Sequence, residues 1–333
     1  MDTSTIISLF VHQLQSPTLG FLIAGMLIAA IKSEFRVPQP IYDFTVYMLL
    51  MTIGLEGGIA IREANIIEML VPAVFCIIIG SGIVLLGYFT FARLPGLRKD
   101  DALATLGLFG AVSSSTMFAG MTFLQDRGIF FEAWVPALYP FMDIPALVTA
   151  ILLANICLAK QSQSIEKVDV KALAKECVTG KALTILIFGV LLGLLTKPEP
   201  LFETFYEPLF KGFLSVLMLT LGIDAYQRLK ELAKVAHWYA LFAVVGPMVH
   251  GMIGFGFGYL AHHLVGFSPG GVIMLAIIAA SNSDISGPPT LRAGIPSANP
   301  SAYIGASTGI GTTVAIGICV PLFTALGTAV FNL

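Results

Sequence analysis

A run of polar residues interrupts an apolar stretch near the C-terminal end of the chain. Ala279–Arg292 reads AASNSDISGPPTLR, and the apolar segment Val272–Ala280 leads directly into it. Hydrocarbon offers no water to backbone N–H and C=O groups, so a helix can break at membrane depth only inside protein or beside a wet cavity. Pro288 lacks an N–H and Pro289 disfavours helix at Pro288, so the helix must break here. An ionisable residue at such a break indicates a functional site, and Asp284 is the first candidate.

A second run of hydroxyl side chains lies earlier in the chain. Gly110–Thr116 reads GAVSSST, and its counterpart Ser281–Gly287 reads SNSDISG. The N–H groups at a half-helix N-terminus carry about half a positive charge and suit an anion. Carbonyls, a carboxylate and hydroxyls suit a hard cation such as Na⁺. The two runs therefore predict an anion beside a cation. In the alternative interpretation, the hydroxyls bond back to helical carbonyls or allow close helix packing.

Asp143 is a second acidic candidate inside an apolar segment. It lies in the sequence YPFMDIPAL, where Pro140 and Pro145 loosen the helix. A charged side chain near the bilayer centre costs about 2.5–3.5 kcal/mol on insertion scales unless it is paired or wet. Bound Na⁺ would supply the missing charge for Asp143 and Asp284. A capping role near a helix end is the alternative for Asp143.

The composition indicates that these residues lie in a polytopic membrane protein. Of 333 residues, 56% are hydrophobic and 11% are charged, whereas charged residues make up about 25% of a soluble domain. A net charge of −2 favours neither nucleic acid nor an anionic membrane surface as a partner. The four cysteines have no close spacing, so we interpret them as small buried hydrophobic residues.

Ten apolar segments can be marked, and they predict an all-α protein of ten transmembrane helices. They are Leu19–Ile31, Ile41–Ile59, Ile67–Phe91, Ala102–Leu124, Trp134–Leu158, Ala182–Leu195, Leu209–Tyr226, Trp238–Leu264, Gly271–Ala293 and Ala302–Phe331. We expect a first five-helix repeat in residues 1–160, a cytoplasmic linker in 161–181 and a second five-helix repeat in 182–333. No cleavable signal peptide is expected.

The basic residues predict the orientation. Alternate loops on one side hold four of the 18 Lys and Arg residues, namely Arg62, Arg127, Lys197 and Lys211, and the other side holds the remaining 14. Basic loops stay in the cytoplasm, so both termini are expected to be external.

A shift of 168 residues aligns the two halves at several separate places. The matches are Thr52–Glu56 with Thr220–Asp224, Pro40 with Pro208, Gly25 with Gly193, and Ala111–Ser115 with Ala279–Ser283. Because each half has an odd number of spans, the second copy must be inverted. Inverted repeats with broken, crossing helices are typical of secondary transporters. Glu56 and Asp224 are interpreted as solvated, ion-paired or capping residues, close to Arg62 and Lys230, and a cavity-lining role is the alternative.

Long motifs resemble the cyanobacterial sodium-dependent bicarbonate transporter family (SbtA type). They are Ser283–Gly305, Asp101–Thr105, Gly107–Ser113 and Ala137–Ala150. The resemblance covers nearly the whole chain. It implies a non-enzymatic symporter that imports bicarbonate with Na⁺ across the plasma (inner) membrane and serves CO₂ concentration. It also implies a homotrimer with core and gate subdomains, and a PII-like nucleotide-binding regulator on the cytoplasmic face.

The resemblance places the substrate region at the two breaks. Its residues here are Ser113, Ser114, Ser115, Ser281, Ser283, Ser286 and Gly287. We assign the Na⁺ ligands to Asp143, Asn282, Asp284 and Thr116. No covalently bound cofactor is expected.

Other function classes remain as alternatives. A Na⁺/H⁺ antiporter shares inverted repeats and broken helices, and a carrier of another small anion would use the same hydroxyl runs. An intramembrane aspartyl protease is disfavoured because the Gly-x-Gly-Asp signature is absent. A passive channel would not require breaks related by a repeat.

Overall fold

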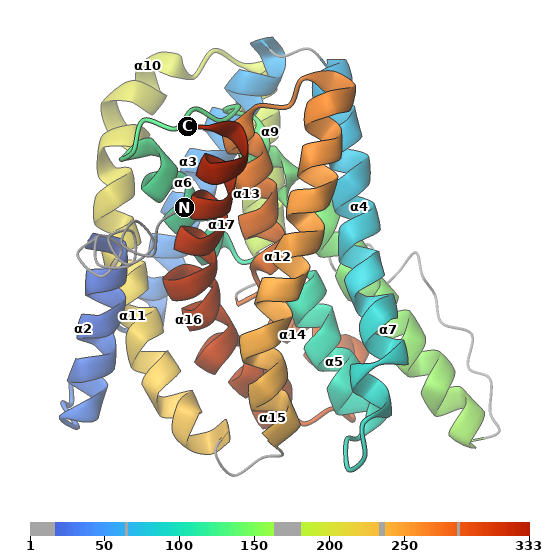
Figure 1. Cartoon of the computed structure of the whole chain (residues 1–333). Coiled ribbons are helices and arrows are strands. Elements are labelled where there is room, and N and C mark those ends of the chain that lie inside the picture. The colour runs from blue at the N-terminus through green and yellow to red at the C-terminus, as the bar shows by residue number, and fades with distance from the viewer. Residues whose placement is uncertain (1–16, 64–65, 163–180, 233–236, 285–286) are drawn as a thin grey trace.

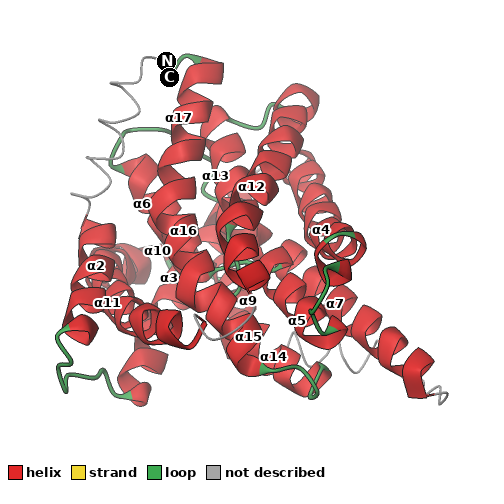
Figure 2. Cartoon of the chain, turned by 60° about the horizontal axis from the view of Figure 1, so that its bottom comes forward, coloured by secondary structure: helices red, strands yellow, loops and turns green. Residues whose placement is uncertain are grey.

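The computed structural model describes residues 17–63, 66–162, 181–232, 237–284 and 287–333, and the regular structure in these ranges is helical (Figures 1 and 2). The first half contains α2 (Pro17–Ala30), α3 (Gln39–Glu63), α4 (Ile66–Phe89), η1 (Phe91–Arg93), α5 (Lys99–Gly110), α6 (Ser114–Gln125), η2 (Val135–Leu138) and α7 (Tyr139–Ser162). The second half contains α9 (Lys181–Leu195), α10 (Glu199–Leu201), η3 (Phe202–Tyr206), α11 (Glu207–Leu232), α12 (His237–Val265), α13 (Pro269–Ala280), α14 (Gly287–Gly294), α15 (Pro300–Ile304), η4 (Gly305–Gly311), α16 (Thr312–Val314), η5 (Ala315–Cys319) and α17 (Val320–Phe331).

Six helical stretches in the described ranges are long and apolar enough to cross a membrane. They are Glu68–Arg93, Lys99–Gln125, Val135–Cys157, Glu199–Asp224, His237–Val265 and Ala302–Phe331. Gly20–Ala30 and Pro269–Ala280 are shorter apolar helices. About 20 apolar residues are needed to cross the hydrocarbon core. The chain is therefore an all-helical polytopic membrane protein.

The helices pack in two groups, and in Figures 1 and 2 α2 and α11 of one group lie on the side opposite to α4 and α7 of the other. In one group α2 packs on α11, α3 packs on α9, and α3 also contacts α11. In the other group α4, α5 and α7 contact one another, and α12 packs against α4 and α13. The segment η4 lies between the groups, because it contacts both α11 and α12.

Two short apolar helices run through the interior of the second group. Every residue of α5 after Lys99 is buried, and so are the residues of α13 after Pro269. A helix that is apolar on all sides is found either inside a protein core or in contact with lipid, and here other elements surround both helices. In both cases the chain leaves helical geometry inside the protein: α5 ends at Gly110 and α13 ends at Ala280.

In each half, the loop that follows the helix after the break is hydrogen-bonded to the start of the buried helix in the other half. Glu132 follows α6, and its carboxylate accepts the N–H and the hydroxyl of Ser268 at 2.7 and 2.8 Å, directly before α13. Asn299 follows α14, and its N–H donates to the Asp101 carboxylate in the first turn of α5 at 2.6 Å. These contacts hold the N-terminal ends of α5 and α13, opposite the ends at which the two breaks lie.

The last apolar segment of the chain is an irregular helix. Its first part includes two π-helical stretches, η4 and η5. Widened turns of this kind are frequently found at functional sites. Gly311 ends η4, and a Cβ there would lie 2.7 Å from the Asn282 side-chain oxygen. Glycine is therefore required where η4 approaches the second break.

Candidate functional site at the two helix breaks

The two breaks are in direct contact. The backbone N–H of Ser113 donates to the Ser281 hydroxyl at 3.0 Å, and this hydroxyl donates to the Ile278 carbonyl at 2.7 Å. The N–H of Ser283 donates to the Leu108 carbonyl, in the last turn of α5, at 2.8 Å. Each break thus satisfies backbone groups that the other leaves without helical partners.

Ser113 connects the start of α6 to Asp284. It is the N-cap residue of α6, and its hydroxyl oxygen accepts the N–H of Thr116 at 3.0 Å. The same hydroxyl donates to the Asp284 carboxylate at 3.1 Å. An N-cap serine is the usual way to satisfy one unpaired N–H of a first helical turn. The Ser113 side chain therefore links the Asp284 carboxylate to the N-terminus of α6.

Asp143 reaches the same break from α7. Its side chain is 1% exposed, and its carboxylate accepts the N–H of Val112 at 3.0 Å. Val112 and Ser113 are adjacent, so the two acids hold neighbouring residues of the first break. The contact explains one role of Asp143: it satisfies an N–H that the end of α5 leaves without a helical partner.

The first turn of α6 holds a cluster of buried hydrogen-bonding groups. Ser114, Ser115 and Thr116 are all 0% exposed. Their hydroxyl oxygens have no hydrogen-bond partner among the described residues. The first four N–H groups of a helix lack partners within the helix; the Ser113 side chain satisfies that of Thr116. Buried polar groups without partners are costly, so this cluster indicates a place for a polar guest.

Asn282 links the second break to the last helical segment. Its side-chain N–H group donates to the hydroxyls of Ser307 and Thr312 at 2.7 and 3.0 Å. The Ser307 hydroxyl donates to the Ser283 carbonyl at 3.1 Å. The Asn282 side-chain oxygen has no hydrogen-bond partner among the described residues. That oxygen is a candidate ligand for a hard cation.

The second half-helix starts at Gly287. Its N–H donates to the Ser283 hydroxyl at 2.8 Å. A Cβ on Gly287 would lie 2.5 Å from Leu108 Cδ2 and 2.8 Å from the Ser283 hydroxyl oxygen. Glycine therefore lets α14 start against the end of α5. Ser286, which the sequence places in the substrate region, lies outside the described residues.

The structure brings most of the expected site residues together and adds two that sequence reasoning missed. Ser307 and Thr312 hold the Asn282 side chain, but neither is among the site residues expected from the sequence. The signal available in the sequence was a run of hydroxyl residues, Ser307, Thr308, Thr312 and Thr313, placed between glycines in an apolar segment. Thr116 lies with Ser114 and Ser115 in the first turn of α6.

The chemistry of the junction is that of oxygen ligands and N–H donors. The N-terminus of the 12-residue helix α6 lies at the Ser113 break, and the N–H groups of its first turn carry the positive end of the helix dipole. The Asp284 carboxylate accepts the Ser113 hydroxyl at this break, and the Asn282 amide and Ser307 hydroxyl are bonded to each other at the second break. Within the described ranges, no group of three or more His, Cys, Asp or Glu side chains could hold a metal ion. The donor set suits an anion together with a hard cation.

Comparison with known proteins agrees with this chemistry. A profile of the Na⁺-dependent bicarbonate transporter superfamily matches residues 17–328. A comparison with curated protein sequences gives no match. The matched residues contain both breaks, both candidate acids and the η4 segment. The function of this family is Na⁺-dependent bicarbonate transport, so the chain is a transport protein that uses Na⁺ and bicarbonate. The match covers nearly the full length, and the chain belongs to the Na⁺-dependent bicarbonate transporter superfamily.

Proposed function

We propose that this protein is a sodium-coupled symporter that imports bicarbonate by alternating access and serves inorganic carbon concentration. The observation that carries the proposal is the junction of the two breaks. There, the buried donors of Ser114, Ser115 and Thr116 lie beside Ser113, which bonds both Ser281 and Asp284. Bicarbonate is a small planar anion, and N–H and hydroxyl donors at a helix N-terminus are suited to it.

Bound Na⁺ would neutralise the acidic side chains that lie beside the anion site. We assign the Na⁺ ligands to Asp143, Asn282, Asp284 and Thr116, and the anion contacts to Ser113–Ser115 with Ser281, Ser283, Ser286 and Gly287. A carboxylate so close to the anion site repels bicarbonate until a cation neutralises it. Na⁺ therefore has to bind for the anion to bind well. This order of binding couples the two substrates.

An inverted repeat of five plus five helices accounts for the packing. A shift of 168 residues carries α3 onto α11, since their bounds are Gln39–Glu63 and Glu207–Leu232. Gly25 of α2 packs against the backbone of α11, and Gly193 of α9 packs against the backbone of α3. These two glycines are themselves 168 residues apart. Repeat-related helices therefore exchange partners, which supports a two-fold relationship between residues 1–160 and 182–333, joined by a linker in 161–181.

Alternating access would move one helix group against the other. We assign α2, α3, α9 and α11 to a gate and the remaining helices to a core that carries both breaks. The ties from Glu132 to Ser268 and from Asp101 to Asn299 join elements within the core, so they would hold through the movement. The contacts of η4 with α11 lie between core and gate and would change.

The setting of the transporter completes the proposal. The charge asymmetry of the loops supports a plasma (inner) membrane protein with both termini external. By its resemblance, the protein would form a homotrimer and bind a PII-like nucleotide-binding regulator on its cytoplasmic face.

The test is uptake of radiolabelled bicarbonate by proteoliposomes with an imposed Na⁺ gradient. We expect uptake that depends on the inward gradient, and none with K⁺ in place of Na⁺. Equal uptake with and without Na⁺ would refute symport. A pH-sensitive dye inside the vesicles tests the antiporter alternative, because Na⁺/H⁺ exchange would change internal pH when neither bicarbonate nor CO₂ is present. Competition by unlabelled nitrate, formate and chloride tests whether another small anion is the substrate.

A further inference from the structure

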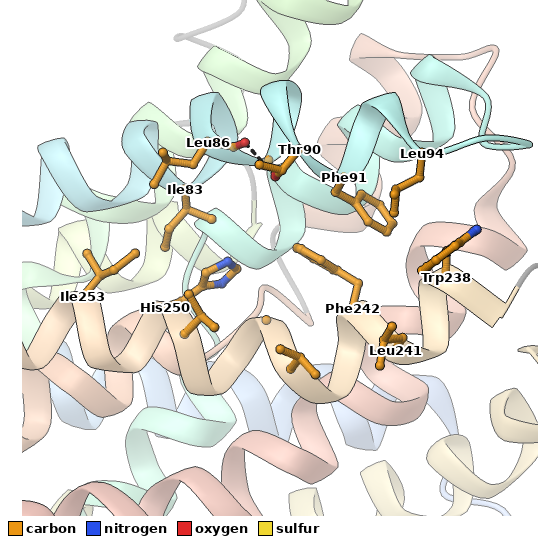
Figure 3. A pocket seen from close by; sticks show the side chains of 14 residues that line it. Ile83, Leu86, Thr90, Phe91, Leu94, Trp238, Leu241, Phe242, His250 and Ile253 are labelled. Atoms are coloured by element: carbon orange, nitrogen blue, oxygen red, sulfur yellow. Dashed lines mark hydrogen bonds between the residues drawn. The ribbon is translucent and has the colours of Figure 1, made fainter.

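A long apolar groove lies between α4 and α12, apart from the helix breaks (Figure 3). Its volume is about 660 Å³, and its walls include Leu86, Phe91, Trp238, Phe242 and His250. This volume is within the range of small-molecule sites, about 300–1,000 Å³. The proposed transport mechanism uses none of these residues, so the groove needs a separate explanation.

The walls of the groove are suited to an apolar occupant. Thr90 is one of the few polar residues in it, and its hydroxyl already donates to the Leu86 carbonyl at 2.8 Å. His250 presents its ring as part of an aromatic wall, because it packs against Phe242 with ring centroids 5.8 Å apart. Phe242 in turn stacks on Phe91 at 4.3 Å. A polar or charged ligand would find few partners here.

The groove is elongated along a membrane-spanning helix. On α12 its lining runs from Trp238 to Ile253, a separation of 15 residues, which corresponds to about 22 Å at 1.5 Å per residue. The hydrocarbon core of a bilayer is about 30 Å thick. The groove therefore follows the direction of lipid tails over more than one leaflet's depth, and an extended chain fits it better than a compact molecule.

One side of the groove is open to lipid. Leu86 is 57% exposed and Val249 is 51% exposed. Large apolar side chains exposed on a membrane-spanning helix face hydrocarbon. The bilayer can therefore supply an occupant directly.

The end of the groove at the start of α12 has the features of a membrane boundary. Trp238 lies there beside Leu94, and tryptophan is enriched at membrane interfaces (Figure 3). The guanidinium of Arg93, between lining residues Phe91 and Leu94, lies 5.1 Å from the ring centroid of Phe89. Basic side chains at such a boundary attract anionic lipid headgroups.

We propose that this groove binds one acyl chain of an anionic phospholipid, with the headgroup near Arg93 and Trp238. The proposal concerns a lipid site of the folded protein and does not depend on the transport mechanism.

The first test is retention of added phosphatidylglycerol or phosphatidylcholine by the purified full-length protein, measured by native mass spectrometry. Val249→Trp and Gly246→Leu fill the groove from two positions on α12; a Cβ on Gly246 would make only ordinary contacts, 3.4 and 3.5 Å from Phe242 and His250. Met252→Trp is the matched control, since Met252 is 53% exposed on the same helix but does not line the groove. We expect at least tenfold weaker phosphatidylglycerol retention in both filled variants and no change in the control.

The headgroup preference and the folded state are tested separately. Arg93→Gln should remove the preference for phosphatidylglycerol over phosphatidylcholine while leaving chain binding intact. If the melting temperatures of the two filled variants are well below that of the unchanged protein, quenching of tryptophan fluorescence by brominated lipid is measured instead. The chain has two tryptophans, so in Trp134→Phe only Trp238 reports, and brominated phosphatidylglycerol should quench it more than brominated phosphatidylcholine. Equal quenching by the two lipids, or full retention by folded groove-filled variants, would overturn the proposal.

Discussion

The N–H of Ser113 donates to the hydroxyl of Ser281 at 3.0 Å, and the two serines are 168 residues apart. The same offset relates Thr52–Glu56 to Thr220–Asp224 in the sequence. In an inverted repeat, residues related by the repeat can touch only where the two-fold axis passes. For the proposed inverted repeat, this hydrogen bond would place the two-fold axis at the helix breaks, as the proposed symporter requires.

Replacing Ser281 with alanine should disturb both stability and transport. The Ser113 N–H would lose its acceptor while remaining buried, at a cost of about 1–3 kcal/mol. We expect a lower melting temperature and at least tenfold slower Na⁺-driven bicarbonate uptake. Ser215→Ala is the control, because Ser215 only donates to a carbonyl of its own helix, and such a change is expected to cost within about 0.5 kcal/mol. Equal behaviour of the two variants would contradict the role given to Ser281.

Neutralising Asp284 should weaken sodium dependence. Asp284→Asn keeps a side-chain oxygen that can accept the Ser113 hydroxyl but removes the charge that binds Na⁺. The Na⁺ concentration for half-maximal uptake should rise at least tenfold, or uptake should cease. Asp43→Asn, at an exposed acid on α3, is the matched control. An unchanged Na⁺ dependence in Asp284→Asn would remove Asp284 from the cation site.

Gly287 should not tolerate even one methyl group. The Cβ of Gly287→Ala would lie 2.5 Å from Leu108 Cδ2 and 2.8 Å from the Ser283 Cβ and hydroxyl oxygen, so these side chains or the start of α14 must shift. A shift of the half-helix N-terminus should reduce bicarbonate uptake strongly while the protein still folds in detergent. Gly256→Ala on α12 has no atom within 4 Å of the new Cβ and serves as the control. Normal uptake by Gly287→Ala would show that the start of α14 is not part of the site.

The tie between Glu132 and Ser268 should stabilise the core. Glu132→Ala removes an acceptor that receives both the N–H and the hydroxyl of Ser268. Hydrogen bonds to a charged group contribute about 1.5–3 kcal/mol each, and partial exposure of Glu132 reduces this. Thermal unfolding should show a clear loss of stability compared with Glu203→Ala, which changes an exposed glutamate. The same melting temperature for both variants would show that the tie contributes nothing.

The features that the sequence could predict are those with a local physical cause. Adjacent prolines after Asp284 exclude a continuous helix, but the expectation that Pro288 itself is not helical was wrong, because both prolines lie in the first turn of α14, where their missing N–H groups cost little. The hydroxyl runs follow directly from the residue types. Composition alone identifies a polytopic membrane protein. The offset of 168 residues indicates which segments correspond, and therefore which breaks face each other.

The contacts that could not be predicted depend on packing between distant segments. Ser307 of η4 and Thr312 of α16 hold Asn282 where Gly311 allows the last helical segment to approach the second break closely. The carboxylate of Asp143 binds the N–H of Val112, a partner that no spacing rule suggests. Arg62, which was expected near Glu56, instead pairs with Glu199 and donates to the carbonyls of Gly193 and Thr196. The long-range arrangement of α3, α9 and α10 decides that pairing.

The central claim is that one junction of two breaks holds bicarbonate beside Na⁺. The most direct measurement is the dissociation constant of bicarbonate for the purified protein at zero and at saturating Na⁺, with K⁺ keeping the ionic strength constant. Coupling between sites is reciprocal and typically changes affinity about 5–150-fold. We predict that Na⁺ tightens bicarbonate binding at least tenfold and that Asp284→Asn abolishes this gain. Bicarbonate binding of the same strength with and without Na⁺ would contradict the shared site.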